Sequence, residues 1–119
     1  MQAANTISQV EHVGASGAPV TVLHIVGDVS SNSKEIILNT FASLTSVSVQ
    51  NILLDFKQVA YLNSSGIAIV IQVLIASRKA SQTVAICGLT PHFTKVFTMV
   101  GITKYTTLHA DEASALASF

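Results

Sequence analysis

Several features that mark whole classes of protein are missing from this chain. Of its 119 residues only 10% are charged, and six lysines and arginines are balanced by six aspartates and glutamates. Without a basic cluster, the chain lacks the electrostatic footprint that nucleic acid or an anionic membrane surface requires. It has no tryptophan and an aromatic share of 6%, so no stacking platform for bases is expected. Nucleic acid is therefore excluded as a partner.

Cysteine and long apolar runs are also scarce. Cys87 is the single cysteine, so no internal disulfide can form. The first residues, MQAANTISQ, lack the basic start and the apolar segment of a secretory signal. The longest apolar run, Ile67–Ala76, has ten residues, whereas a membrane span needs about 20. We therefore expect a cytoplasmic chain with no membrane insertion.

Apolar residues, in contrast, are abundant, at 50% of the chain. A chain of this length corresponds to one domain, residues 1–119, which buries roughly two-thirds of its unfolded surface. Such a core needs no metal or disulfide to be stable. Apolar surface that the core does not bury is compatible with a homodimer.

Strand and helix patterns alternate in the first half. Ile7–Val13 and the β-branched run Val20–Val26 are predicted strands, joined by a hairpin loop at Gly14–Pro19. Helical spacing of apolar residues over Lys34–Leu44, behind a group of polar N-cap candidates, predicts an amphipathic helix. The almost wholly apolar Asn51–Phe56 is typical of a strand near the centre of a sheet that is covered on both faces.

The second half continues this alternation. Polar caps before residues 64–80, and cations at their end, favour a helix there. The elements expected after it are a strand at Thr83–Cys87, a helix from Pro91 ended by Gly101, an edge strand at Thr106–His109 and a final helix through Ala117.

Spacing also predicts the inward face of the helix that begins at Pro91. Val96, Phe97 and Val100 are expected to point inward. Phe93 and Met99 are expected to join Phe97 in the core rather than to line a ligand site.

The predicted order of elements is β-β-α-β-α-β-α-β-α. Strands that alternate with helices imply an α/β fold joined by right-handed crossovers. We expect a mixed, mostly parallel sheet of four to five strands with four helices packed against it.

The segment Asn63-Ser64-Ser65-Gly66 is the first candidate for chemistry. It is expected at the start of a helix, where unpaired N–H groups and the helix dipole favour an anion. A phosphate on Ser64 would suit this place and would change the surface offered to a partner. The plainer interpretation is that both serines only cap the helix.

Four parts of the sequence carry a resemblance to a known family. They are, in order, Gly27-Asp28-Val29, Leu53-Leu54-Asp55-Phe56, Asn63-Ser64-Ser65-Gly66-Ile67, and the stretch from Thr90-Pro91 to Gly101-Ile102. With this spacing the chain resembles a STAS domain, and more narrowly the small anti-sigma factor antagonists.

The resemblance implies a protein-binding switch without catalysis or cofactor. Such a protein binds an anti-sigma factor that is also a serine kinase, thereby releases a sigma factor, and loses this binding when it is phosphorylated. The matching serine is Ser64, and a serine phosphatase would restore the unmodified form. The residues that the resemblance implies for partner binding are Asp28, Ser30, Ser31, Asn32, Asn63, Ser65 and Gly66.

Two positions depart from the family pattern. Asn63 stands where the family usually has aspartate, and asparagine still caps a helix while removing one negative charge. Ser30 stands where family members often have a second acidic residue.

Two alternatives come from other classes of protein. STAS domains also resemble subunits of transporters and of large stress-sensing assemblies, in which Ser64 would serve only as a cap. An enzyme is the other alternative, but Ser64 and Ser65 lack the flanking glycines of a hydrolase nucleophile. No Gly-rich nucleotide-binding pattern is present either.

The remaining polar candidates are assigned no chemistry. The four histidines, His12, His24, His92 and His109, are widely scattered and lack the set of Cys, Asp or Glu companions that a zinc or iron site would need nearby in sequence, so no metal is expected. Cys87 is expected to be a small buried hydrophobe. Asp55 is expected to form an ion pair with Lys57 or to cap the loop after its strand.

Overall fold

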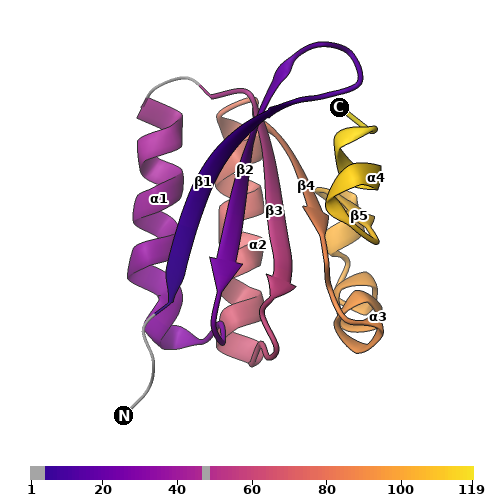
Figure 1. The fold of residues 1–119 in the computed structure, drawn as a ribbon. Coiled ribbons are helices and arrows are strands. Elements are labelled where there is room, and N and C mark those ends of the chain that lie inside the picture. Colours follow the sequence, from indigo (N-terminus) through magenta and orange to yellow (C-terminus); the bar gives the residue numbers. More distant parts are fainter. Residues whose placement is uncertain (1–4, 47–48) are drawn as a thin grey trace.

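The computed structural model describes residues 5–46 and 49–119, which form one sheet with helices on both faces (Figure 1). The order of the strands in the sheet follows the chain, and only the first pair is antiparallel. The strands are β1 (Thr6–Val13), β2 (Pro19–Val26), β3 (Asn51–Gln58), β4 (Thr83–Cys87) and β5 (Thr107–His109). The predicted mixed, mostly parallel sheet and the central place of β3 are confirmed.

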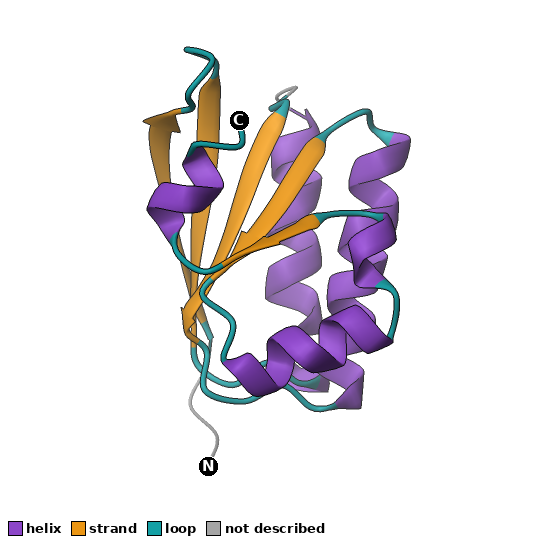
Figure 2. Ribbon diagram, turned by 90° about the vertical axis from the view of Figure 1, so that its right-hand side faces the viewer, coloured by secondary structure: helices purple, strands orange, loops and turns teal. Residues whose placement is uncertain are grey.

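The predicted alternation with helices is also confirmed. The helices are α1 (Lys34–Ser46), α2 (Ser64–Lys79), α3 (Pro91–Met99) and α4 (Glu112–Leu116), with short 3₁₀ turns η1 (Ser31–Ser33) and η2 (Ile102–Lys104). Figure 2 shows that α4 covers one face of the sheet, whereas α1, α2 and α3 lie on the other.

Strand periodicity divides the core into two layers. On β3, Ile52, Leu54 and Phe56 point into the large core beneath α1, α2 and α3. Leu53 belongs to a smaller cluster beneath α4, where it meets Ala115 of that helix. The expectation that β3 is covered on both faces is therefore correct.

The apolar run Ile67–Ala76 lies inside α2. Its buried members include Ile69, Val70, Val73 and Leu74, which recur at helical spacing. Among the helices in the described part of the chain, none is both long and apolar enough to cross a membrane.

Two local expectations were wrong. The serines before α1 do not cap that helix directly, because Ser31–Ser33 form η1 in between. In α3, Phe93 and Phe97 are buried, but Met99 and Val100 are 78% and 50% exposed. The reason is that α3 ends at Met99, and Gly101 then turns the chain with φ 85°. The last turn of the helix therefore lies beyond the core.

Candidate functional site

The predicted site is assembled from two loops at the end of the sheet where the parallel strands finish. Val29, in the loop after β2, forms an isolated parallel bridge with Leu62, in the loop after β3. The Val29 N–H donates to the Tyr61 carbonyl at 3.0 Å, and the Asn63 N–H donates to the Val29 carbonyl at 3.3 Å. This pairing places the loop from Asp28 beside the start of α2.

Asn63 is the N-cap of α2, as its residue type predicts. Its Oδ1 accepts a hydrogen bond of 2.8 Å from the Gly66 N–H, and its carbonyl accepts from the Ile67 N–H at 3.0 Å. Asparagine therefore provides the cap that an aspartate would provide, without adding negative charge.

Ser64 and Ser65 are the first two residues of α2, and both side chains are exposed. No described residue bonds the Ser64 hydroxyl or accepts from the N–H groups of these two serines. Two open N–H groups and the positive end of a helix dipole favour an anion at this place. Because Ser64 is exposed, a phosphate on its hydroxyl would not clash with the core of the domain.

Gly66 is required by the close approach of α2 to the neighbouring loop. A Cβ built on Gly66 would lie 2.2 Å from the Val29 carbonyl oxygen and 2.8 Å from its carbon. Both are far inside van der Waals contact, and the obstacle is backbone. Gly66 therefore fixes the distance between the helix start and the loop that carries Asp28.

The rest of that loop is held by a buried serine, while most of its other side chains are exposed to solvent. Asp28, Ser31 and Asn32 are exposed, and Ser30 is half-buried. The buried Ser33 hydroxyl accepts from the Ser30 N–H at 3.1 Å, so the loop is shaped by its own serines. The predicted partner-binding residues thus lie in two adjoining segments, Asp28–Asn32 and Asn63–Gly66.

Sequence reasoning missed Asn5, which ties this loop to the sheet. Its Nδ2 donates to the carbonyls of Val26 at 3.1 Å and Asp28 at 2.9 Å. Its Oδ1 accepts from the Ser33 hydroxyl. Nothing in the local sequence marks Asn5, because its partners lie more than 20 positions away in the chain.

Tyr61 is a second residue that sequence reasoning did not assign to the candidate surface. It directly precedes the site, is 53% exposed, and packs edge-on against Phe93 with ring centroids 6.3 Å apart. An exposed aromatic side chain anchored by a second ring is typical of protein interfaces.

The other polar candidates have mixed outcomes. Asp55 neither pairs with the Lys57 side chain nor caps the loop after β3, because its Oδ1 accepts from the Lys57 N–H at 2.9 Å and both residues lie within that strand. Cys87 is buried, as expected. The expectation that the histidines lack acidic companions is wrong in space, since His24 lies beside Asp55 and Glu112.

The fold and the paired loops define an α/β domain with an exposed serine at the entrance to its second helix. A family model for the STAS domain matches residues 8–115. The chain therefore belongs to the STAS domain family. No curated protein matches the sequence significantly.

Solved structures with the same fold come from proteins of different roles. An anti-sigma factor antagonist from Mycobacterium paratuberculosis is 18% identical, with a TM-score of 0.78, and the match covers 98% of this chain and 96% of that one. The Bacillus cell fate determinant SpoIIAA, in its phosphorylated form, is 15% identical, with a TM-score of 0.67 over 92% of this chain and 96% of its own.

A transporter contains the same fold as one part of a longer chain. Murine Slc26a9, an anion transporter, is 10% identical with a TM-score of 0.75, and the match covers 94% of this chain but 22% of the transporter. At such identities the likeness shows the fold alone.

Proposed function

We propose that this chain is an anti-sigma factor antagonist whose binding is switched off by phosphorylation of Ser64. Its partner would be an anti-sigma factor with serine kinase activity, and a serine phosphatase would return the chain to its binding form. The chain itself would act in the cytoplasm, without catalysis and without a cofactor.

The observation that supports this most is the exposed hydroxyl of Ser64 at the N-terminus of α2, beside the exposed residues Asp28, Ser31 and Asn32. The kinase would transfer the γ-phosphoryl group of ATP to the Ser64 Oγ, with loss of the hydroxyl proton and release of ADP. The product would carry about −1.5 to −2 charge on the surface that previously presented a neutral hydroxyl.

The physical basis of the switch is local. The folded domain tolerates the phosphate, because the helix dipole and the open N–H groups of Ser64 and Ser65 stabilise an anion. A partner surface that fits the bare hydroxyl would instead meet a bulky charge. The paired loops remain in place, since Asn63 and Val29 hold them through backbone contacts and a cap.

Incubation with the serine kinase and ATP tests the site assignment. Mass spectrometry is expected to place one phosphate on Ser64, and Ser64→Ala should abolish the modification. Ser8→Ala is the control, because Ser8 is an exposed serine on β1, outside the two segments of the site, and should leave Ser64 modified. Phosphate on Ser65 or elsewhere in the wild-type chain would contradict the proposal.

A second candidate function is a non-catalytic scaffold subunit of a transporter or a stress-sensing complex. It is favoured by the likeness in fold to one part of Slc26a9, an anion transporter. In that role Ser64 would only begin the helix, so Ser64→Glu would leave assembly unchanged. Co-purification with a membrane transporter or a multi-subunit particle, rather than with a kinase, would support it.

A further inference from the structure

A cluster of metal-ligating side chains lies on the opposite face of the sheet from α2. Strand register places His24 opposite Asp55, and Asp55 opposite Cys87, so the three residues form a row across β2, β3 and β4. Alternation along β4 puts this row on the face covered by α4, where Cys87 joins the smaller core.

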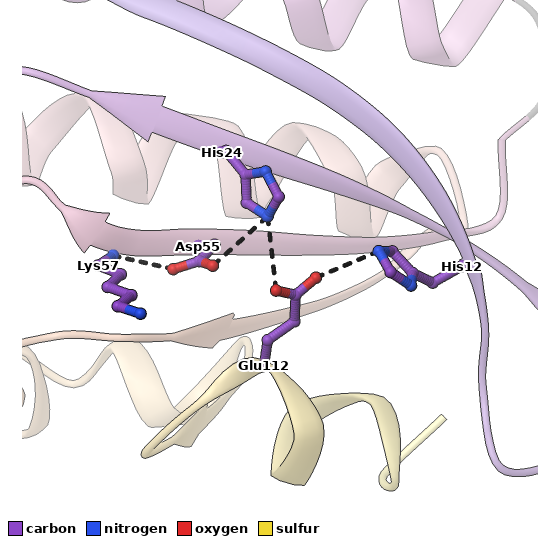
Figure 3. A network of polar contacts seen from close by, with 5 residues as sticks. All are labelled: His12, His24, Asp55, Lys57 and Glu112. Carbon is purple, nitrogen blue, oxygen red and sulfur yellow. Dashed lines mark hydrogen bonds and ion pairs between the residues drawn. The ribbon is translucent and has the colours of Figure 1, made fainter.

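Glu112, the first residue of α4, points from that helix toward His24 and Asp55 (Figure 3). Its Oε2 lies 3.5 Å from the His24 Nε2, which is also 3.5 Å from the Asp55 Oδ2. The helix start that carries Glu112 is fixed by Asp111, whose Oδ1 accepts from the Ser114 N–H at 2.8 Å. The three ligand atoms of His24, Asp55 and Glu112 lie within 4.8 Å of one another.

These separations fit a bound metal ion better than direct hydrogen bonds. A charge-assisted hydrogen bond between an imidazole and a carboxylate spans about 2.7–2.9 Å, well below the 3.5 Å found for both His24 contacts. Nitrogen and oxygen ligands at about 2.0–2.2 Å from a tetrahedral zinc ion lie about 3.3–3.5 Å apart. Both His24 contacts therefore have the separation of neighbouring ligands on one ion, and the two carboxylates lie within 4.8 Å of each other.

The two carboxylate oxygens of Glu112 have different neighbours, because Oε2 faces His24 and Oε1 faces His12 (Figure 3). The Glu112 Oε1 is buried, yet it accepts no hydrogen bond from the described residues and faces the His12 Nε2 at 3.4 Å. The His12 imidazole is therefore the group that compensates Oε1, and it leaves Oε2 directed at His24. Asp55 adds a second carboxylate to the cluster, and it is only 7% exposed.

The surroundings leave room for an ion and prepare its ligands. A cavity of about 190 Å³, lined by His24, Asp55, Lys57 and Glu112 among others, opens onto the cluster. The Lys57 N–H holds the Oδ1 of Asp55 at 2.9 Å, which leaves Oδ2 directed at His24. Gly88 is needed beside it, because a Cβ there would lie 2.9 Å from Asp55 Oδ1.

We propose that His24, Asp55 and Glu112 bind a divalent transition-metal ion of the zinc type. One imidazole and two carboxylates form a donor set that suits zinc, with water in the remaining position. His12 acts as a positioning residue that orients Glu112. The ion neutralises two carboxylates and joins α4 to strands β2 and β3, independently of whether Ser64 is phosphorylated.

A zinc titration of the full chain tests this site. The protein is treated with a chelator, dialysed, and titrated with zinc chloride against a chromophoric competitor. One equivalent is expected to bind per chain. His24→Ala and Glu112→Gln should each weaken binding by at least about tenfold, a loss that even outer-shell partners of metal ligands can cause. His12→Ala should weaken it less than Glu112→Gln does.

His92→Ala is the matched control, because His92 is an exposed histidine outside the cluster. It should bind zinc like the wild type. Equal zinc affinity in wild type and in folded Glu112→Gln would overturn the proposal, as would an equal loss in His92→Ala. Circular dichroism establishes that each variant is folded, and Glu112→Gln keeps the size of the side chain.

Thermal unfolding supplies a second readout. An ion that binds only the native state raises the melting temperature. Zinc should therefore raise that of the wild type and leave that of Glu112→Gln unchanged, while magnesium at the same concentration raises neither, since it favours oxygen ligands and retains water. A zinc effect of the same size in Glu112→Gln would count against the site.

Discussion

The carbonyl oxygen of Val29 occupies the space that a side chain at Gly66 would need, at 2.2 Å from an ideal Cβ. This contact sets how close the first turn of α2 comes to the loop after β2. Because Ser64 stands on that turn and Asp28 on that loop, the same contact determines the shape of the candidate partner surface.

Gly66→Ala is expected to lower the free energy of unfolding by about 1–3 kcal/mol, because the added methyl group forces two backbone segments apart. Urea denaturation measures the change. Ser65→Ala, on the same turn but exposed, is the control and should stay within about 0.5 kcal/mol of the wild type. Equal stability of the two variants would show that the close approach is not rigid.

Replacement of Asn63 separates its capping role from its charge. Asn63→Ala should cost about 0.5–2 kcal/mol, because the Gly66 N–H loses its acceptor. Asn63→Asp should be at least as stable as the wild type at neutral pH, since a carboxylate also caps and is favoured near a helix N-terminus. Chemical denaturation of the three proteins gives the order, and an alanine variant as stable as the wild type would refute the cap.

Asn5→Ala should loosen the loop that carries Asp28, Ser31 and Asn32, which are proposed to bind the partner. The change removes the bonds of Asn5 to Val26 and Asp28 and leaves the buried Ser33 hydroxyl without one of its partners. Hydrogen exchange of residues 28–33 should become faster than in the wild type. Gln9→Ala, at an exposed position of β1, serves as control, and the same exchange rates in both variants would contradict this role of Asn5.

Cys87 is expected to be unreactive in the folded chain. Burial, and then the negative charge of Asp55, raise the pKa of the Cys87 thiol from 9.0 to about 12. Because the thiolate is the reactive form, iodoacetamide at pH 8 with a chelator present should label the urea-unfolded chain and leave the native chain unlabelled. Rapid labelling of the native chain would mean that the smaller core opens readily.

The same shift predicts a loss of stability in alkali. The fold favours the protonated thiol, so the contribution of Cys87 is fully present below pH 9 and is lost as the pH rises toward 12. Cys87→Ala lacks this titration and is the control for a pH series of urea denaturation. If both proteins lose stability equally between pH 9 and pH 10.5, other groups govern the alkaline limit.

The sequence predicted most of the architecture because periodicity and caps are local signals. The bounds of β4 were predicted without error, and α2 was placed to within one residue at its C-terminus. The inward face of α3 was partly wrong, because helical spacing cannot show where the covering surface ends. Met99 and Val100 have the residue types of a core but lie beyond it.

The candidate site could be located from the Asn63–Gly66 segment, but its second loop and its support could not be derived from local pattern. The bridge between Val29 and Leu62 and the anchoring bonds of Asn5 depend on strand register. The same limit explains why the acidic neighbours of His24 were not predicted. His24 and Glu112 are distant in sequence, and only the packing of α4 on the sheet brings them together.

The most direct test of the switch compares two variants at one position by titration calorimetry with the anti-sigma factor. Ser64→Ala preserves a small neutral side chain and should bind like the wild type. Ser64→Glu should bind more weakly by about 1–3 kcal/mol, because it places an unpaired negative charge in the interface. Equal affinities of the two variants, both folded by circular dichroism, would contradict the account.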